Sequence, residues 1–426
     1  MNPKIIIITS NIPYPLSEGG KISQFAFLDY LQYSLNIKLL LVANSKQEEE
    51  DIITLKNLLP KVNIEYSINY TKQVYTPIKE KITLKKIIKK IYYLISDKIT
   101  KPKKPEIKPI KKEETVLSFP FNFNILNKNI INDFIKTIDD FNPDIIQIEH
   151  NLFIGLIHAI PKKYKTVFVE HEIQYEKIRT QNKISESNYE KYILELTGNI
   201  ERSLLNEYSL VLTFSEEDKK HLEYYNVKTL IESSPFPILD NAFDNNSTNN
   251  IEKIVFIGGE GHPPNKDALE WYLNTMSLEI YNKTSLKIHI IGNWSNDFKE
   301  KYNQPHIIFD GYVENLKINC HNSLMIVPLR IGSGIRTKIL YGIAQSLPIV
   351  STNVGCEGIG LKNMENILIA DDTETFIKHI IDLINNNELS EKIATNAYKF
   401  AKNNFSQESL SNKRLKIYFK LINNEF

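Results

Sequence analysis

A turn with two glycines, followed by two cations, is the clearest chemical feature of this sequence. Gly332-Ser333-Gly334 comes shortly after the apolar run that ends at Val327, and Arg336 and Lys338 follow within four residues. Glycine lets a backbone approach a ligand closely, and the amide groups at the start of a helix bind anions. Because cations in the first helical turn oppose the helix dipole, this pair predicts a bound anion with the charge of a diphosphate. The alternative is a plain turn with solvated cations.

Two pairs of glutamate and histidine follow buried strands predicted in the first half. Glu149-His150 comes at the end of the apolar run Asp144–Ile148, and Glu170-His171 follows Thr166–Val169. Open α/β sheets bind ligands beyond the carboxyl ends of their strands. We therefore expect Glu149, His150 and His171 to be catalytic candidates that contact substrate. For each histidine the alternative is a side chain that hydrogen-bonds a loop carbonyl.

A metal ion is the other chemistry that these glutamates and histidines could serve. The sequence has no His-x-x-x-His pair and no Asp-x-Asp motif. We therefore expect no required metal and no cofactor. Its two cysteines, Cys320 and Cys356, are too few for a disulfide framework or a four-ligand zinc site.

A second glycine pair, Gly19-Gly20, precedes Lys21 in the loop after the first apolar run. Two glycines after prolines usually form no more than a loop. On its own this pair therefore predicts a loop, and a binding role for it depends on the resemblance described below.

Short apolar runs alternate with amphipathic stretches along the chain. The strands predicted in the first half are Ile5–Ile8, Lys38–Val42, Asp144–Ile148, Thr166–Val169 and Leu210–Thr213, with a helix over about 23–33. The strands predicted in the second half are Lys253–Ile257, Lys287–Ile291, His306–Phe309, Leu324–Val327, Ile349–Ser351 and Asn366–Ile369, and its helices are Asp267–Tyr272, Ile335–Gln345, Thr375–Leu383 and Gln407–Ile422. This rhythm predicts an α/β protein with two Rossmann-like parallel-sheet domains facing a cleft.

Length and composition suggest where the domains begin and end. A chain of 426 residues exceeds what one core usually supports. The polar stretch 241–250 predicts a linker between a domain over 1–240 and a domain over 251–405, followed by a helical segment over 406–426. A Lys-rich insertion over about 72–112 carries apolar residues among its lysines. It reads equally as an amphipathic helix on an anionic membrane or as an insertion packed on the domain.

The bulk charge and hydropathy exclude several partners. The formal net charge is +1, so the sequence indicates no electrostatic attraction to nucleic acid. No apolar run reaches the roughly 18 residues of a membrane-spanning helix, and the run after Lys4 is too short for a signal peptide. We therefore expect a cytoplasmic protein. Peripheral contact with the inner face of the membrane is the alternative that the Lys-rich insertion leaves open.

The second half also resembles the donor-binding domain of glycosyltransferase family 4 and its group 1 relatives. The resemblance is carried by Val255–Gly259, Pro264–Leu269, Gly311–Leu316, Pro328–Leu340, Leu347–Thr352 and Val354–Gly358, in the family's order. It implies the two-domain GT-B fold and a retaining transfer of a sugar from a nucleotide sugar to an acceptor hydroxyl. The acceptors of such enzymes are commonly bacterial surface polysaccharides or lipid-linked glycans.

The resemblance also implies roles for individual residues. The donor-binding positions that it gives are Gly258, Gly259, Asn265, Gly311, Tyr312, Val313, Ser333, Gly334, Arg336, Lys338 and Tyr341. Gly19, Gly20 and Lys21 match the loop that borders the donor phosphate and the acceptor. Glu149 matches the position that contacts the acceptor or the transferred sugar, and the C-terminal helix matches one that crosses back to the first domain.

One position departs from the family pattern. Tyr341 stands where the family usually has a glutamate that binds the ribose hydroxyls. A tyrosine hydroxyl makes fewer hydrogen bonds than a carboxylate with two oxygens. The departure leaves two alternatives open, a catalytically weak or inactive binding partner and a nucleotide-sugar epimerase on the same scaffold.

Overall fold

The computed structural model describes residues 2–16, 19–69, 127–181, 188–244, 250–313, 316–332 and 336–426. Ser333, Gly334 and the Lys-rich insertion lie outside the described residues, and the predictions about them stay predictions. Within the described part, no helix is long and apolar enough to cross a membrane.

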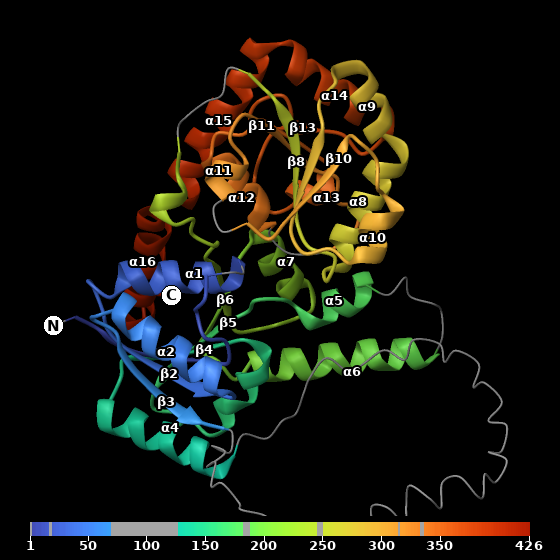
Figure 1. Cartoon of the computed structure of the whole chain (residues 1–426). Coiled ribbons are helices and arrows are strands. Elements are labelled where there is room, and N and C mark those ends of the chain that lie inside the picture. The colour runs from blue at the N-terminus through green and yellow to red at the C-terminus, as the bar shows by residue number, and fades with distance from the viewer. Residues whose placement is uncertain are drawn as a thin grey trace, which may run out of the picture. The chain divides into compact units, whose positions relative to one another are not determined.

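The first sheet has seven described strands, all parallel, in the order β3-β2-β1-β4-β5-β6-β7 (Figure 1). They are β1 Lys4–Thr9, β2 Asn36–Ala43, β3 Asn63–Ile68, β4 Ile145–Glu149, β5 Lys165–Val169, β6 Leu210–Thr213 and β7 Leu230–Ser233. The helices between them are α1 Gly19–Leu31, α2 Lys46–Leu58, α4 Lys128–Phe141, α5 Gln174–Gln181, α6 Asn188–Leu205 and α7 Glu216–Tyr224, with 3-10 helices at Asn151–His158 and Asp240–Ala242. Central strands such as β1 are continuous apolar runs because helices bury both faces of a parallel sheet.

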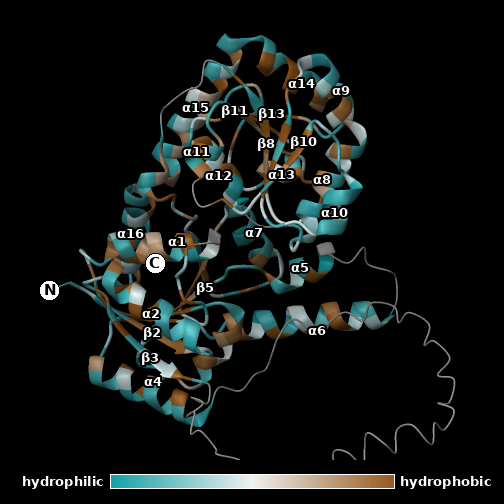
Figure 2. Ribbon diagram, viewed as in Figure 1, coloured by the Kyte–Doolittle hydropathy of each residue, from teal (hydrophilic) through white to brown (hydrophobic). Residues whose placement is uncertain are grey.

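The second sheet has six described strands, also parallel, in the order β10-β9-β8-β11-β12-β13. They are β8 Lys253–Ile257, β9 Ile288–Ile291, β10 Ile307–Gly311, β11 Ser323–Val327, β12 Ile349–Ser351 and β13 Leu368–Ile369. Its helices are α8 Pro263–Thr275, α9 Ser277–Thr284, α10 Asn296–Lys301, α11 Leu316–Asn319, α12 Thr337–Ala344, α13 Asn353–Cys356, α14 Thr373–Asn385 and α15 Asn387–Phe405. Figure 2 shows largely brown, apolar strands among helices that carry both brown and teal residues. The predicted fold class, two Rossmann-like parallel sheets, is confirmed.

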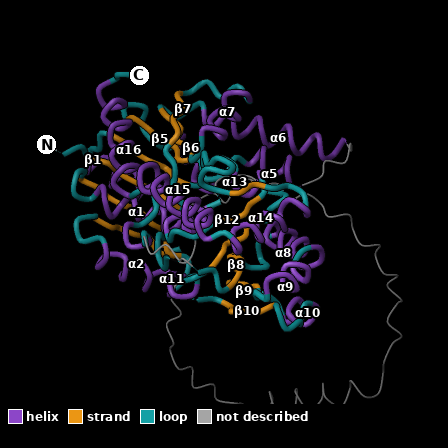
Figure 3. Tube along the Cα trace, turned by 90° about the horizontal axis from the view of Figure 1, so that it is seen from above, coloured by secondary structure: helices purple, strands orange, loops and turns teal. Residues whose placement is uncertain are grey.

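The last helix, α16 (Gln407–Asn423), packs on α1 of the first sheet domain (Figure 3). The Gln407 amide donates to the Ala26 carbonyl and to the Asp29 carboxylate, each at 2.9 Å. Farther along α16, the Arg414 guanidinium donates to the Ser234 hydroxyl at 2.8 Å. The end of the chain thus contributes buried side chains to the domain formed by its beginning.

The structure differs from the sequence prediction in three places near the site. Helix α1 begins at Gly19, so Gly19 and Gly20 lie in its first turn rather than in a loop. Helix α12 begins at Thr337, which makes Arg336 its N-cap residue rather than a member of the first turn. Strands β3 and β7 were not predicted because they lie at the two edges of the first sheet and lack a buried apolar run.

Candidate functional site

In each sheet, the strands run outward in both directions from the first strand of the domain, so the strand order reverses at that strand. In the first sheet, β1 lies between β2 and β4, and in the second, β8 lies between β9 and β11. Open α/β sheets bind ligands at such a switch point, beyond the carboxyl ends of the strands. Most of the residues predicted from sequence to be functional lie at the ends of β1, β4, β8 and β11 or in the loops and helices that follow these strands.

The turn after β8 is built so that two backbone segments touch. Gly258 has φ 156°, and Gly292, after β9, has φ 139°. A Cβ added to Gly292 would lie 2.5 Å from the Gly258 carbonyl oxygen, so only glycine fits there. The Trp294 indole donates to the same oxygen at 2.8 Å. This packing fixes the path of the predicted donor residues Gly258 and Gly259.

Asn265, in the first turn of α8, connects that turn to α12. Its amide donates to the Gly259 carbonyl at 3.0 Å, and its carbonyl oxygen accepts from the Lys338 ammonium at 2.5 Å. The Lys338 ammonium also lies 5.1 Å from the centroid of the Phe256 ring. The structure therefore brings together the predicted residues Gly259, Asn265 and Lys338.

Arg336 and Lys338 form a partly desolvated pair of cations. Arg336 is only 8% exposed, and burial lowers its pKa. Burial and the nearby charge of Arg336 lower the pKa of Lys338 to about 7. Burying two neighbouring cations costs free energy, a cost that the charges of Glu357 and Asp218 reduce for Arg336. A ligand with two or more negative charges would offset that cost.

The remaining predicted donor residues lie around these cations or on β10. A Cβ added to Gly332, which has φ 118°, would meet the Arg336 guanidinium at 3.1 Å. Gly311 ends β10 with φ 74° and accepts a hydrogen bond from the Gly292 amide at 2.7 Å. Tyr312 is 62% exposed, and Val313 follows it.

Tyr341 lies on α12, one helical turn after Lys338. Burial raises the pKa of its hydroxyl, so the group is neutral at physiological pH. Among the described residues the hydroxyl has no hydrogen-bond partner, which leaves it available to a ligand.

The other half of the site is centred on Glu149, the last residue of β4, which pairs with Thr9 at the end of β1. Glu149 is 4% exposed. One carboxylate oxygen accepts from the Gln24 amide at 2.9 Å and from His171 Nε2 at 3.1 Å, and the other accepts from the Gln147 amide at 2.6 Å. Burial raises the pKa of Glu149. The hydrogen bond from His171 and the charge of His171 lower the pKa by more in total, with smaller contributions from other groups, so the pKa of Glu149 is below its ordinary value. Glu149 is thus ionised, and it orients its neighbours.

The two predicted histidines stack beside this carboxylate. Their ring centroids are 3.7 Å apart, with 27° between the planes. His150 adopts a positive φ of 68°, which is uncommon for a residue with a side chain and frequent at functional sites. Burial, aided by the charge of His171, lowers the pKa of His150 to about 3, so its ring is neutral. An ionised carboxylate only accepts hydrogen bonds, so His171 Nε2 must carry the proton that points to Glu149.

Glu149, His150 and His171 also offer three ligand atoms that lie within 4.8 Å of one another. Metal ligands converge on one point, whereas these two rings lie nearly parallel and Glu149 already accepts three hydrogen bonds. The arrangement favours a hydrogen-bonded glutamate–histidine dyad.

Gly19, Gly20 and Lys21 open α1, the helix that also carries Gln24. A Cβ added to Gly20 would have no heavy atom within 4 Å, so packing does not require glycine at this position. The free amides of a helix N-terminus suit an anion, and the prediction that this segment borders the donor phosphate remains a prediction.

The sequence analysis missed several residues that shape the site. They contact a predicted site residue, or a residue that holds one in place, and they are Gln147, Tyr418, Gly292 and Trp294. A polar residue inside the buried run Ile145–Glu149 was the signal that could have identified Gln147. Nothing in the local pattern indicated Tyr418, because its partner is 271 positions away.

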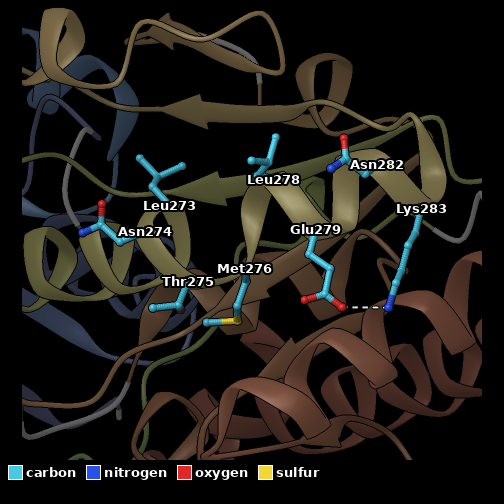
Figure 4. Close-up of a pocket in the computed structure, with 8 residues that line it drawn as sticks. All are labelled: Leu273, Asn274, Thr275, Met276, Leu278, Glu279, Asn282 and Lys283. Carbon is cyan, nitrogen blue, oxygen red and sulfur yellow. Dashed lines mark hydrogen bonds and ion pairs between the residues drawn. The ribbon is translucent and has the colours of Figure 1, made fainter.

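A separate hollow of about 580 Å³ lies where α8 meets α9, lined by residues such as Leu273, Met276 and Lys283 (Figure 4). Lys283 makes a surface ion pair with Glu279 at 2.7 Å there. The hollow is at the far end of α8 from Asn265, about 15 Å along a helix that rises 1.5 Å per residue. It has no part in the site.

Comparisons with known proteins bear on the family of the second domain and on the fold. Residues 251–386 match the sequence model of the family described as Glycosyl transferases group 1. A 44.6 kDa protein of the cps region of Klebsiella pneumoniae is 24% identical over 419 residues, covering 96% of this chain and 97% of that protein.

Solved structures share the fold at low identity. HepE of Anabaena, crystallised with UDP, has a TM-score of 0.62 at 10% identity and covers 97% of this chain and 99% of its own. TarM of S. aureus, in complex with UDP and α-GlcNAc-glycerol, has a TM-score of 0.64 at 13% identity, over 98% and 99% of the two chains. Sucrose-phosphate synthase of Thermosynechococcus elongatus has a TM-score of 0.66 at 12% identity, over 99% and 100%. The two-sheet arrangement is therefore the GT-B fold.

Proposed function

We propose that this chain, whose residues 251–386 match the group 1 glycosyltransferases, transfers a sugar from a nucleoside diphosphate to a hydroxyl of a surface glycan, with retention of configuration. The observation that carries this proposal is the desolvated pair Arg336 and Lys338 at the start of α12. Such a pair is matched to an anion that carries more than one charge.

The donor's diphosphate would lie against these two cations and the start of α12. Negative charge develops on the diphosphate as its bond to the sugar breaks. Lys338 is held by Asn265 before any ligand arrives. A preorganised cation stabilises the developing charge without the cost of moving into place.

The acceptor hydroxyl and the transferred sugar would meet the histidine pair. Glu149 fixes the ring of His171 by accepting its Nε2 proton, so the Nδ1 edge of that ring is turned away from the carboxylate. The neutral ring of His150 can donate one hydrogen bond and accept another. We assign these rings to orienting the substrate hydroxyls, because in retaining transfer the leaving phosphate can itself accept the acceptor's proton.

The choice of substrates to test follows from the relatives. Relatives encoded in the cps region of Klebsiella pneumoniae support a role in surface polysaccharide synthesis. HepE is solved with UDP-glucose, and TarM with UDP and an α-GlcNAc-glycerol. We therefore propose UDP-sugars as the first donors and glycans, free or lipid-linked, as the acceptors, with neither a metal nor a cofactor required.

A panel of UDP-sugars, with and without glycan acceptors, tests the proposal by measuring UDP release and the mass of the product. We expect one donor to give UDP release that requires the acceptor and continues at the same rate in the presence of a metal chelator. Arg336→Ala and Lys338→Ala should each lower kcat/KM by roughly 100-fold, the size expected for a lost charge-assisted contact in the transition state. The control is Lys283→Ala, a surface lysine in the last turn of α9, which should leave the rate unchanged. Equal rates in all four proteins would overturn the phosphate assignment.

A donor-binding protein that no longer transfers sugar is the second candidate, and Tyr341 is the observation that favours it. Its single hydroxyl replaces a carboxylate that binds both ribose hydroxyls in the resembling family. Calorimetry separates the candidates: UDP binding with no turnover of any donor supports the binding protein. Release of nucleotide or isomerisation of the sugar without any acceptor would indicate the epimerase alternative.

A further inference from the structure

Glu149 is held by donors from three different elements. Gln24 is on α1, Gln147 is on β4 and His171 follows β5. The first two are neutral amides, and Gln147 is 1% exposed. Each donated hydrogen bond favours the charged form of a buried carboxylate.

A glutamine amide can face its partner in two orientations, whereas the three hydrogens of a lysine ammonium are equivalent. The carbonyl and the amino group of a glutamine side chain have nearly the same shape. If Gln147 turned over, its carbonyl oxygen would face the Glu149 carboxylate, and two acceptors would oppose each other. Something must therefore hold the amino group toward Glu149.

Tyr418 of α16 supplies that constraint. Its hydroxyl donates to the carbonyl oxygen of Gln147, on the opposite side of the amide from Glu149. Tyr418 is 2% exposed, and burial raises its pKa to about 12, so the hydroxyl keeps its proton at physiological pH. A hydroxyl that donates here admits only the orientation of Gln147 in which Nε2 points to Glu149.

Arg414, one turn earlier on α16, adds a charge to the same network. Its guanidinium lies 3.6 Å from the centroid of the Phe27 ring and donates to the Ser234 hydroxyl. It is among the charges that lower the pKa of Glu149, together with His171. The titratable and charged groups around Glu149 are thus His150, His171, Arg414 and Tyr418, and two of the four belong to α16.

We propose that Gln147 and Tyr418 are positioning residues, which keep Glu149 ionised and aimed at His171 Nε2, so that the C-terminal helix completes the acceptor side of the site. The chain of contacts runs from Tyr418 through Gln147 and Glu149 to His171, and none of the first three needs to touch substrate. This inference rests on the proposed function, since it assigns the histidines to the acceptor side.

The variant Tyr418→Phe removes one oxygen and keeps the buried ring. Without the hydroxyl, Gln147 can turn over and Glu149 loses a donor for part of the time, so its pKa rises. Loss of ionised Glu149 then begins at a higher pH. We expect the acid limb of the kcat/KM profile to move up by about half a pH unit or more, since half a unit corresponds to roughly a threefold change in the ionisation constant.

The matched control is Gln407→Leu, which removes a different buried bond between α16 and the first domain. Gln407 binds Ala26 and Asp29 of α1 and has no contact with the Glu149 network. If α16 merely docks, both variants should lower stability and leave the pH profile in place. Under the proposal, only Tyr418→Phe moves the acid limb.

A readout that needs no activity keeps this test separate from the proposed function. In ¹⁵N-histidine-labelled protein, the ring shifts of His171 should change as Glu149 takes up its proton on acidification. Tyr418→Phe and Gln147→Leu should both move that change to higher pH, whereas Gln407→Leu should not. Unchanged His171 shifts in both network variants would overturn the inference even if the enzyme transfers sugar. Altered shifts in a protein that transfers nothing would leave the network established and the proposed function wrong.

Discussion

Lys338 is the residue whose charge is most sensitive to the conditions of an experiment. Burial and Arg336 bring its pKa to about 7, whereas a free lysine titrates near 10.4. A bound diphosphate favours the protonated ammonium, so binding takes up a proton whenever Lys338 is neutral in the free protein. Affinity for UDP should therefore fall as the pH rises above about 7.

We expect the Kd for UDP to rise by roughly tenfold per pH unit between pH 7.5 and 9, until the pKa of the complex is reached. Calorimetry in buffers with different heats of ionisation should show proton uptake over this range. Lys338→Met removes the titrating group and should bind more weakly at pH 7 with a much flatter pH dependence. The same slope in both proteins would mean that another group titrates.

The turn after β8 is the element on which the donor side depends. Gly292 has a φ that residues with a Cβ avoid, and an added Cβ would lie 2.5 Å from the Gly258 carbonyl oxygen. Both atoms belong to rigid backbone, so neither can yield easily. We expect Gly292→Ala to lower the free energy of unfolding by about 3 kcal/mol and to weaken UDP binding, because Asn265 and Lys338 depend on this turn.

Urea denaturation and UDP titration of Gly292→Ala measure both effects. Gly261→Ala, in the loop after β8 against which Gly292 packs, is the control because an added Cβ meets nothing within 4 Å. It should change stability by less than about 0.5 kcal/mol. If the two variants behaved alike, close packing of the turn would not be what fixes the donor side.

The elements also differ in how far their sequences predict them. Buried strands such as β6 and β8 were predicted with the bounds that the structure has, because a strand covered on both faces must be apolar throughout. The edge strands β3 and β7 are covered less and carry polar residues, so no run identified them. The start of α12 was placed two residues early, since the sequence does not distinguish an N-cap arginine from one in the first turn.

At the scale of the whole molecule, the sequence indicated the groups of residues but not all the contacts among them. Strand ends gave Glu149, His150 and His171, because side chains there meet at one edge of a sheet. The glycine turn in the sequence pointed to the two cations that follow it, Arg336 and Lys338. The Tyr418–Gln147 contact joins residues 271 positions apart, and it exists only after α15 and α16 have brought the end of the chain to the first sheet.

The central claim is that Arg336 and Lys338 bind the diphosphate of a nucleotide sugar. A crystal structure of the chain with UDP tests it most directly. The account predicts phosphate oxygens within about 3 Å of both side chains, the hydrogen-bond distance of a charge-assisted contact, with the nucleoside near Gly311 and the ribose beside Tyr341. A UDP molecule bound elsewhere, or diphosphate oxygens that touch neither Arg336 nor Lys338, would contradict it.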